Sequence, residues 1–337
     1  MSREEAPTVE RITEIFRRLV DGGRKFVLTT HVNPDGDGLG CELALNRYLK
    51  KLGKDSVILN HSETPSNHIF LDPENEIKKF EPERDTKTLL DADVLFALDM
   101  NNSSRLRSME NAFLKSKARK AIIDHHLEAK DFVDYQLIDL ESPATGEIIY
   151  KCLAGYDAGL LDKPIAEALY AAIMTDTGSF RFPRTDAEVH RIVAHLLELG
   201  VDPNYIYNNL YEQNSLGRTR LLGEVLASIR LAYDGRLSYF SITQEQLKRH
   251  GVSLDETDNF VNNAGTIAGV VVTIFFLELT NGVKISFRSK GDIPVNELAK
   301  LYGGGGHKNA SGARLYDVQL DDVVRNVLRD AEKLLPK

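Results

Sequence analysis

The chain of 337 residues is long enough for two hydrophobic cores, and 42% hydrophobic with 27% charged residues is an ordinary globular composition. The formal net charge of −8 argues against a protein that grips long nucleic-acid duplexes, because such proteins usually carry a basic face large enough to show in the total charge. A local basic patch for a small anionic ligand is compatible with this charge.

The cysteines and the apolar segments bear on where the protein works. Cys41 and Cys152 are too few for a disulfide framework or a thiolate metal site. The N-terminal residues are acidic where a signal peptide would be basic and then apolar. The longest uncharged run, Asn259 to Leu277, contains polar residues and fits a buried strand better than a membrane span. These features predict a soluble, cytoplasmic protein with no membrane partner.

The first half of the chain alternates predicted helices and strands. A helix capped by Thr8 comes first, and Gly22 and Gly23 end it. The strands that follow are continuously apolar, which is typical of parallel strands covered on both faces. We place strands at 25–30, 56–60, 94–99 and 120–124, and helices at 39–52, 146–153 and 164–175. This alternation predicts an open parallel sheet with helices on both sides.

The pattern changes in the second half. A polar helical stretch from Asp186 to about Ile229 precedes strands joined by Asn281-Gly282, a dipeptide typical of hairpin turns. The strands are predicted at 237–242, 269–279 and 283–288, and helices at 295–301 and 320–335. We therefore predict an α/β protein whose N-terminal domain is a doubly wound, mostly parallel sheet and whose C-terminal domain is smaller and also α/β. The expected boundaries are 1–188 for the first domain, 189–225 for a helical linker and 226–337 for the second domain.

Histidine and aspartate side chains follow the predicted strands and one predicted helix of the first domain. Ligands of open α/β sheets bind beyond the carboxyl ends of the strands, so we expect these side chains to gather in one place. They are His31, Asp35, Asp37, Asp99, Asp124, His125, His126 and Asp176. Hard divalent cations prefer carboxylate oxygen, and imidazole adds a preference for a metal such as manganese. Two such cations close together are a standard device for phosphoester hydrolysis.

Each of these groups also has an ordinary structural explanation. The Asp-Gly-Asp loop could be a helix-capping turn, Asp99 could be another cap, and His125 and His126 could be surface residues. Coincidence in four separate segments favours the metal site. A dinucleotide-binding loop at 36–40 is a further alternative, but its third glycine would fall on Cys41 and its carboxylates would repel a pyrophosphate.

A run of glycines marks the second domain. It consists of Gly303, Gly304, Gly305 and Gly306, followed by His307. Such a run costs backbone entropy, and a loop whose amides approach a phosphate, a flexible hinge or a tight turn would explain it. The spacing does not fit a Walker loop. Ser286 and Arg288 lie on a neighbouring predicted strand, where Arg288 could hold a phosphate with two hydrogen bonds or be a solvated charge.

Taken together, these residues resemble the signature of the DHH phosphoesterase family. In order along the chain, the signature is His31 with Asp35 and Asp37, then Asp99, then Asp124-His125-His126, then Asp176. The sequence FRSK at 287–290 and the glycine run before His307 resemble the DHH-associated C-terminal domain. The resemblance extends from about Lys25 to Arg314.

The resemblance implies a role for each residue. One metal ion would be held by His31, Asp35 and Asp99, and the other by Asp37, Asp99, His125 and Asp176. His126 would face the substrate phosphate with help from Arg105, and Asp124 would orient the histidines. The substrate would be bound by Ser286, Arg288, Gly303, Gly304, Gly305, Gly306 and His307. Manganese is the usual ion of the family, with magnesium as the alternative.

Length, acidity and the glycine run most resemble the nanoRNases of this family. These enzymes degrade very short oligonucleotides such as pApA to mononucleotides and convert 3′-phosphoadenosine 5′-phosphate to AMP. The resemblance implies short oligonucleotides and small nucleotides as partners, excludes long duplexes, and allows a homodimer. A cyclic di-AMP phosphodiesterase would look almost the same in sequence, and a pyrophosphatase or exopolyphosphatase would carry a different C-terminal domain. A non-catalytic nucleotide-binding protein is disfavoured because every expected metal position is filled.

Overall fold

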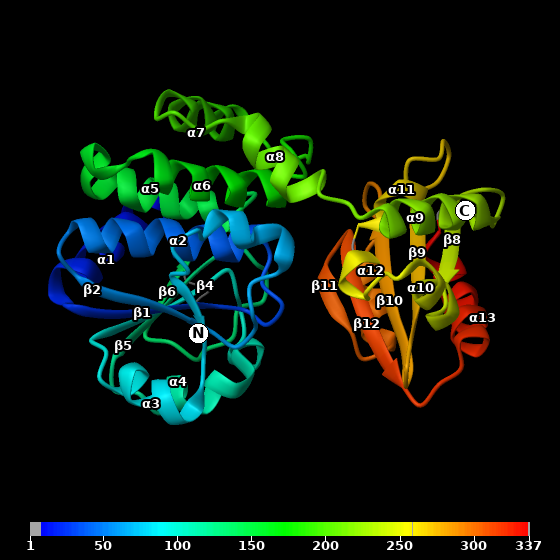
Figure 1. The fold of residues 1–337 in the computed structure, drawn as a ribbon, viewed down its shortest axis with the longest axis horizontal. Helices are drawn as coiled ribbons and strands as arrows, with labels where there is room; N and C mark the ends of the chain where they lie inside the picture. Colours follow the sequence, from blue (N-terminus) through cyan, green and yellow to red (C-terminus); the bar gives the residue numbers. More distant parts are fainter. Residues whose placement is uncertain (1–7, 258, 336–337) are drawn as a thin grey trace. The chain divides into compact units, whose positions relative to one another are not determined.

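The computed structural model describes residues 8–257 and 259–335, and the chain divides into two compact units (Figure 1). The N-terminal unit ends at Gln213 and the C-terminal unit begins at Asn214. The division falls inside the stretch predicted as a linker. Its helices α7 (Ala187–Glu198) and α8 (Pro203–Tyr211) belong to the first unit, and α9 (Leu216–Ser228) belongs to the second. Within the described residues, no helix combines the length and the apolar character needed to span a bilayer.

A six-stranded parallel sheet forms the centre of the N-terminal unit, with the strand order β3-β2-β1-β4-β5-β6. Its strands are β1 (Lys25–Thr30), β2 (Asp55–Asn60), β3 (Ile77–Lys79), β4 (Val94–Leu98), β5 (Arg119–Asp124) and β6 (Tyr135–Ile138). The predicted doubly wound parallel sheet is confirmed. Its winding direction reverses between β1 and β4, and ligands of such sheets bind at this reversal, outside the carboxyl ends of the strands.

Helices cover both faces of this sheet (Figure 1). One face carries α1 (Val9–Gly22), α2 (Gly36–Lys51), α5 (Thr145–Asp157) and α6 (Lys163–Asp176), whose apolar side chains form one core with the strands. The other face carries α3 (Pro82–Leu90) and α4 (Glu110–Lys115), which form a second core. Short 3-10 helices lie at Ser66–Leu71, Ser103–Met109 and Ala158–Leu160.

Helix α2 begins at Gly36, three residues before the predicted start at Leu39. Asp35 caps it, because its carboxylate accepts hydrogen bonds from the backbone N–H groups of Asp37 (3.1 Å) and Gly38 (3.2 Å). The loop with two aspartates is therefore mostly the first turn of a helix, and this turn fixes the direction of the Asp37 side chain.

The glycines of α2 allow close packing on both sides of the helix. A Cβ atom at Gly38 would lie 2.4 Å from Oγ1 of Thr30 in β1, and one at Gly40 would lie 2.3 Å from the Ala168 carbonyl oxygen in α6. Real Cβ atoms do not approach other atoms so closely. The glycines that could have formed a dinucleotide-binding loop therefore let α2 fit between the sheet and α6.

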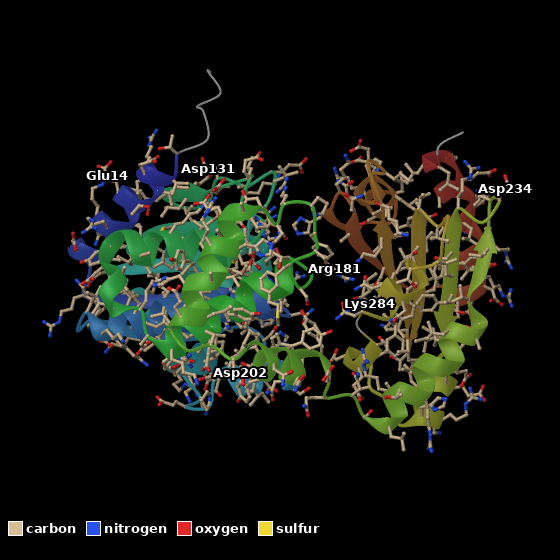
Figure 2. The ribbon with its side chains drawn as sticks, turned by 90° about the horizontal axis from the view of Figure 1, so that it is seen from above. Glu14, Asp131, Arg181, Asp202, Asp234 and Lys284 are labelled. Atoms are coloured by element: carbon tan, nitrogen blue, oxygen red, sulfur yellow. The ribbon has the colours of Figure 1, made fainter. Side chains whose placement is uncertain are left out.

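The C-terminal unit contains a second six-stranded sheet, in the order β11-β12-β10-β9-β8-β7. The strands are β7 (Arg230–Ala232), β8 (Leu237–Ile242), β9 (Val272–Leu279), β10 (Gly282–Ser289), β11 (Gly305–His307) and β12 (Ala310–Tyr316). Strands β8 and β9 pair in parallel, and the other pairs are antiparallel. One face packs against α9, α10 (Gln244–His250) and α11 (Phe260–Ala264), and the other against α12 (Val295–Leu301) and α13 (Leu320–Ala331). Figure 2 shows the side chains along this sheet, with Lys284 of β10 labelled.

The glycine run is an ordered part of this sheet. Gly305 and Gly306 belong to β11, which pairs with β12 at the edge. Gly303 and Gly306 have positive φ values of 69° and 135°, which glycine adopts readily. A Cβ at Gly304 would lie 2.1 Å from the Gly312 carbonyl oxygen. The flexible hinge considered from the sequence is therefore replaced by an edge strand, and Gly304 and Gly306 pass too close to β12 for a Cβ atom.

Candidate metal centre

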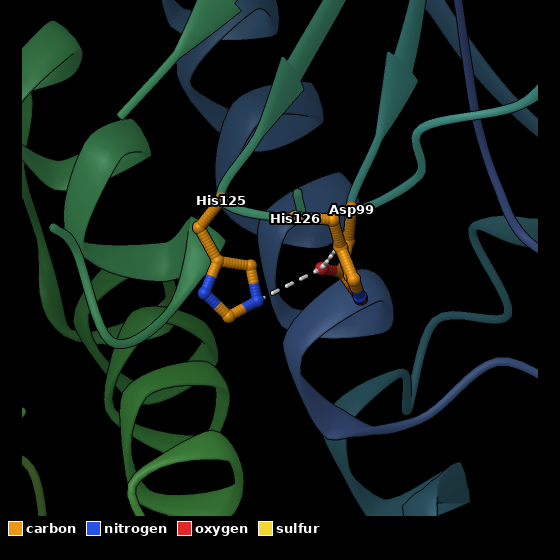
Figure 3. A group of neighbouring side chains, drawn as sticks. All are labelled: Asp99, His125 and His126. Carbon is orange, nitrogen blue, oxygen red and sulfur yellow. Dashed lines mark ion pairs between the residues drawn. The ribbon is translucent and has the colours of Figure 1, made fainter. Parts of the chain in front are cut away.

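Asp99 occupies the middle of the cluster at the carboxyl ends of β1, β4 and β5. It follows β4 with a φ of 57°, a left-handed conformation that Asp tolerates better than most residues. Its backbone N–H donates to the carbonyl oxygen of Ile123 (3.0 Å). Oδ2 of the buried carboxylate lies 3.4 Å from Nε2 of His31. Oδ1 lies 3.6 Å from both Nε2 of His125 and Nδ1 of His126 (Figure 3).

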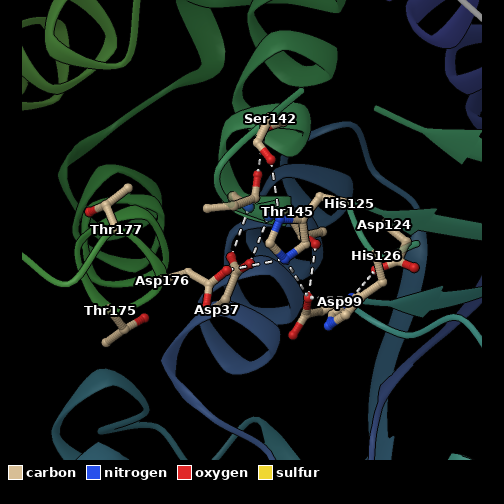
Figure 4. A network of polar contacts seen from close by, with 12 residues as sticks. Asp37, Asp99, Asp124, His125, His126, Ser142, Thr145, Thr175, Asp176 and Thr177 are labelled. Atoms are coloured by element: carbon tan, nitrogen blue, oxygen red, sulfur yellow. Dashed lines mark hydrogen bonds and ion pairs between the residues drawn. The ribbon is translucent and has the colours of Figure 1, made fainter. Parts of the chain in front are cut away.

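Asp37 and Asp176 extend the cluster on another side of His125 (Figure 4). Nε2 of His125 lies 3.1 Å from Oδ2 of Asp176, at the end of α6. The two carboxylate oxygens of Asp37 accept hydrogen bonds from the backbone N–H groups of Thr145 (2.6 Å) and Gly146 (2.8 Å). The N-terminus of α5 therefore holds the Asp37 carboxylate in place.

His31 and Asp35 form the side of the cluster nearest to β1. Nδ1 of His31 lies 2.9 Å from the carbonyl oxygen of Val32, and its Nε2 lies 3.7 Å from Oδ2 of Asp35. His31 is buried, whereas the Asp35 side chain is 55% exposed. Asp35 therefore lies where the cluster opens to solvent.

The predicted ligands form three overlapping groups, each with ligand atoms within 4.8 Å of one another. The groups are Asp99, His125 and His126; His31, Asp35 and Asp99; and Asp37, His125 and Asp176. The family resemblance implies that His126 contacts the substrate. In the structure His126 also lies close enough to Asp99 and His125 to share a metal ion with them. Carboxylate oxygens combined with imidazole nitrogens fit divalent cations. Asp99 and His125 each belong to two of the groups, which suits two cations that lie close together.

The electrostatics of the cluster also fit a cation. Burial and the negative charges of Asp99 and Asp176 raise the pKa of Asp37 well above its ordinary value. Burial lowers the pKa of His125, but the hydrogen bond to Asp176 and the negative charges of the surrounding aspartates together more than offset this and raise the pKa to about 10. Carboxylates buried this closely need positive charge to be stable, and divalent cations supply it.

The same balance applies to His31. Burial opposes its protonation, but hydrogen bonds to Asp35 and Asp99 raise its pKa to about 10. Burial would likewise raise the pKa of Asp99, whereas the hydrogen bond from His31 and the charges of the other histidines hold it far below its ordinary value.

Residues that orient the ligands were missed in the sequence. Oγ1 of Thr145 donates to Oδ1 of Asp99 (3.0 Å), and Nδ1 of His125 lies 3.2 Å from the carbonyl oxygen of Ser142. The Ser142 hydroxyl donates to Oε2 of the buried Glu147 (2.7 Å). Ser142 lies in the loop between β6 and α5, and Thr145 and Glu147 lie in the first turn of α5. No motif in the sequence marks them, and β6 itself was not predicted.

The three predicted catalytic residues lie at this end of the sheet. Asp124 is fully buried, and its Oδ1 lies 2.6 Å from Nδ1 of His126. It was expected to orient both histidines, and the Ser142 carbonyl oxygen takes this place for Nδ1 of His125. Arg105 is half-buried, and its carbonyl oxygen accepts a hydrogen bond from the backbone N–H of Val32 (2.9 Å), beside His31.

The predicted substrate-binding side chains of the C-terminal unit share one face of its sheet. Arg288 of β10 and His307 of β11 both lie opposite Ala310 of β12. Directly opposed residues project to the same face, and so do residues two apart on one strand, such as Lys284, Ser286 and Arg288. Strand pairing therefore gathers basic and hydroxyl side chains into one row beside the glycine run.

Two family models and several known proteins match this chain. The model of the DHH family, N-terminal domain, matches residues 25–173, and that of the DHHA1 domain matches residues 238–335. The bifunctional oligoribonuclease and PAP phosphatase NrnA of Bacillus subtilis is 30% identical over 310 residues, which cover 91% of this chain and 94% of that protein.

Two further proteins are similar over nearly the whole chain. The cyclic-di-AMP phosphodiesterase GdpP of Geobacillus thermodenitrificans is 25% identical over 336 residues, which are 95% of this chain but 49% of that protein. The crystal structure of an exopolyphosphatase-related protein from Bacteroides fragilis superposes with a TM-score of 0.92 at 29% identity and covers 99% of both chains. The chain belongs to the DHH family of phosphoesterases, with a DHH domain followed by a DHHA1 domain.

Proposed function

We propose that this protein is a manganese-dependent phosphoesterase that hydrolyses short oligonucleotides such as pApA to mononucleotides and converts 3′-phosphoadenosine 5′-phosphate to AMP. The observation that carries the proposal is the cluster of carboxylates and imidazoles around Asp99. The substrate class is supported by the likeness to NrnA over nine-tenths of the chain. We expect the enzyme to act in the cytoplasm.

The ligand sets are those that the family resemblance implies, and the three groups of side chains support them. We assign His31, Asp35 and Asp99 to one cation, and Asp37, Asp99, His125 and Asp176 to the other. Bound there, the cations would supply Lewis acidity and an activated water at neutral pH. Imidazole ligands favour manganese over magnesium, so we expect Mn²⁺ to support faster turnover than Mg²⁺.

The remaining side chains act on the substrate. His126 is 16% exposed, and Asp124 holds its Nδ1. We assign Nε2 of His126 to a phosphoryl oxygen of the substrate, where a hydrogen bond from the ring would stabilise the negative charge that develops. Arg105, after β4, would add a second positive charge.

In the C-terminal unit, the row of Arg288, Ser286 and His307 beside the glycine run is our candidate for binding a terminal phosphate or base. A guanidinium can grip a phosphate with two hydrogen bonds, and nearby backbone amides add further donors. Hydrolysis confined to short substrates is the expected consequence of recognising a terminus.

A cyclic di-AMP phosphodiesterase is the second candidate, supported by the likeness to GdpP. A time course of product release separates the two. The purified protein with Mn²⁺ would be given pApA, a longer RNA, 3′-phosphoadenosine 5′-phosphate, cyclic di-AMP and pyrophosphate. Fast release of mononucleotides from pApA, with slow attack on the longer RNA, supports the proposal. Preference for cyclic di-AMP or for pyrophosphate would overturn the substrate assignment.

A further inference from the structure

The segment directly after Asp176 has an unusual backbone. Gly178, Ser179 and Phe180 follow one another with left-handed φ values of 57°, 60° and 64°. Only glycine adopts this conformation without cost, so the segment stores strain at Ser179 and Phe180. Such strain persists where the surrounding structure enforces it, and it gathers at functional sites.

Thr177 fixes the shape of this turn. Its carbonyl oxygen accepts hydrogen bonds from the backbone N–H groups of Arg181 (3.1 Å) and Phe182 (3.0 Å). Its hydroxyl accepts one from the N–H of Phe180 (3.1 Å), whose ring packs against Tyr170 with centroids 5.6 Å apart. These contacts define the shape of the turn that carries Arg181 and Phe182.

Phe182 presents a supported aromatic ring at the surface. The side chain is 47% exposed. The ring rests on Gly178, because a Cβ atom there would lie 2.5 Å from two of the ring carbons. Arg181, which is exposed and labelled in Figure 2, donates from Nε to the Gly178 carbonyl oxygen (2.8 Å), and its guanidinium lies 5.8 Å from the ring centroid. These contacts hold the ring in place before any ligand arrives.

The chain links this ring to the candidate metal centre through Gly178. The glycine beneath it comes two residues after Asp176, whose carboxylate points toward His125 (Figure 4). Arg181 is exposed beside the ring, and Arg184 is exposed two residues further along the chain, in a protein whose net charge is −8. An aromatic face with adjacent guanidinium groups is the combination that binds single nucleotides.

We propose that Phe182 is a stacking platform for the nucleobase of a nucleotide whose phosphate is held at the candidate metal centre. The inference rests on the proposed function and adds a subsite to it. Every nucleobase has a π face, so this platform binds nucleotides without selecting one base. It gives the N-terminal unit its own contact with the substrate beyond the phosphate.

Calorimetry with the full-length, Mn²⁺-loaded protein tests the platform. AMP and ribose 5-phosphate carry the same phosphate and sugar, and only AMP has a base. The wild type should bind AMP about tenfold or more tightly than ribose 5-phosphate. Phe182→Ala should weaken AMP binding about tenfold and leave ribose 5-phosphate unchanged, whereas Phe182→Trp should retain the preference. Tyr205→Ala removes another exposed ring (48%) of the same unit and should change neither affinity.

Equal affinities of the wild type for both ligands, or an equal effect of Phe182→Ala on both, would overturn the platform. Turnover of pApA in the same preparation separates this failure from that of the proposed function. No hydrolysis together with a base preference that depends on Phe182 would reject the function and keep the subsite. Hydrolysis of pApA without a base preference that depends on Phe182 would keep the function and reject the subsite.

Discussion

Asp99 combines a left-handed backbone with a buried carboxylate that lies within 3.6 Å of three imidazole rings. As the ligand shared by both proposed cations, it should be the least replaceable residue of the cluster. Asp99→Asn keeps the shape of the side chain but removes its charge. We expect turnover to fall about 10³-fold or more, because stabilisation by the cations amounts to several kcal/mol. Steady-state kinetics and metal analysis check this, and near-normal turnover would reject the shared-ligand assignment.

Thr145 tests how far the orientation of the ligands matters. Its hydroxyl donates to Oδ1 of Asp99 (3.0 Å), although it belongs to none of the predicted ligand sets. Thr145→Ala should weaken Mn²⁺ binding or turnover about 10- to 100-fold, as is usual for groups that orient metal ligands. Thr145→Ser keeps the hydroxyl and is the matched control. Equal loss in both variants would assign the effect to packing.

The protonation of the histidines predicts a pH dependence. The metal-free protein holds protons on His31 and His125 with pKa values of about 10, so a cation must displace them. Below pH 10 the apparent affinity for Mn²⁺ should therefore rise with pH, about tenfold per pH unit for each proton released. Titrations at pH 6.5 and 8.5, in buffers of different ionisation enthalpy, measure both affinity and proton release. An affinity that does not change with pH would contradict these pKa values.

At the scale of elements, the close contact of α2 with α6 fixes the position of α2, which carries Asp35 and Asp37 at its N-terminus. Gly40→Ala places a methyl group against the Ala168 carbonyl oxygen and should destabilise the protein by about 1–3 kcal/mol. Gly223→Ala, in α9, meets no atom within 4 Å and should stabilise by about 0.5–1 kcal/mol. Urea unfolding followed by circular dichroism compares the two, and similar effects would show that α2 and α6 can separate freely.

Elements with long apolar patterns could be predicted from the sequence. Strands β1 and β8 and helix α12 lie at the predicted residues. The short strands β3, β6, β7 and β11 were not predicted, because three or four residues carry no recognisable period. The glycine run was interpreted as a loop, since pairing with a distant strand leaves no local signal.

The same limit applies to the site. The metal-binding candidates could be predicted because each follows a recognisable strand or helix. Thr145 and Ser142 could not, because they act through single hydrogen bonds across 46 and 17 positions in the chain. The alignment of Arg288 with His307 likewise depends on the register of three strands.

At the scale of the whole molecule, each unit has its own sheet and its own cores. The N-terminal unit holds all candidate metal ligands, and the C-terminal unit holds the row of basic side chains. We therefore propose that the chemistry belongs to the N-terminal unit, and that the C-terminal unit adds contacts to the substrate. A homodimer stays a prediction from the family, which light scattering of the purified protein would test.

Anomalous diffraction at the manganese edge, from crystals grown with Mn²⁺, tests the central claim most directly. The account predicts two peaks about 3.5–4 Å apart, both in contact with Asp99. One peak should adjoin His31 and the other His125. A single peak, or peaks that Asp99 does not join, would contradict the two-cation centre.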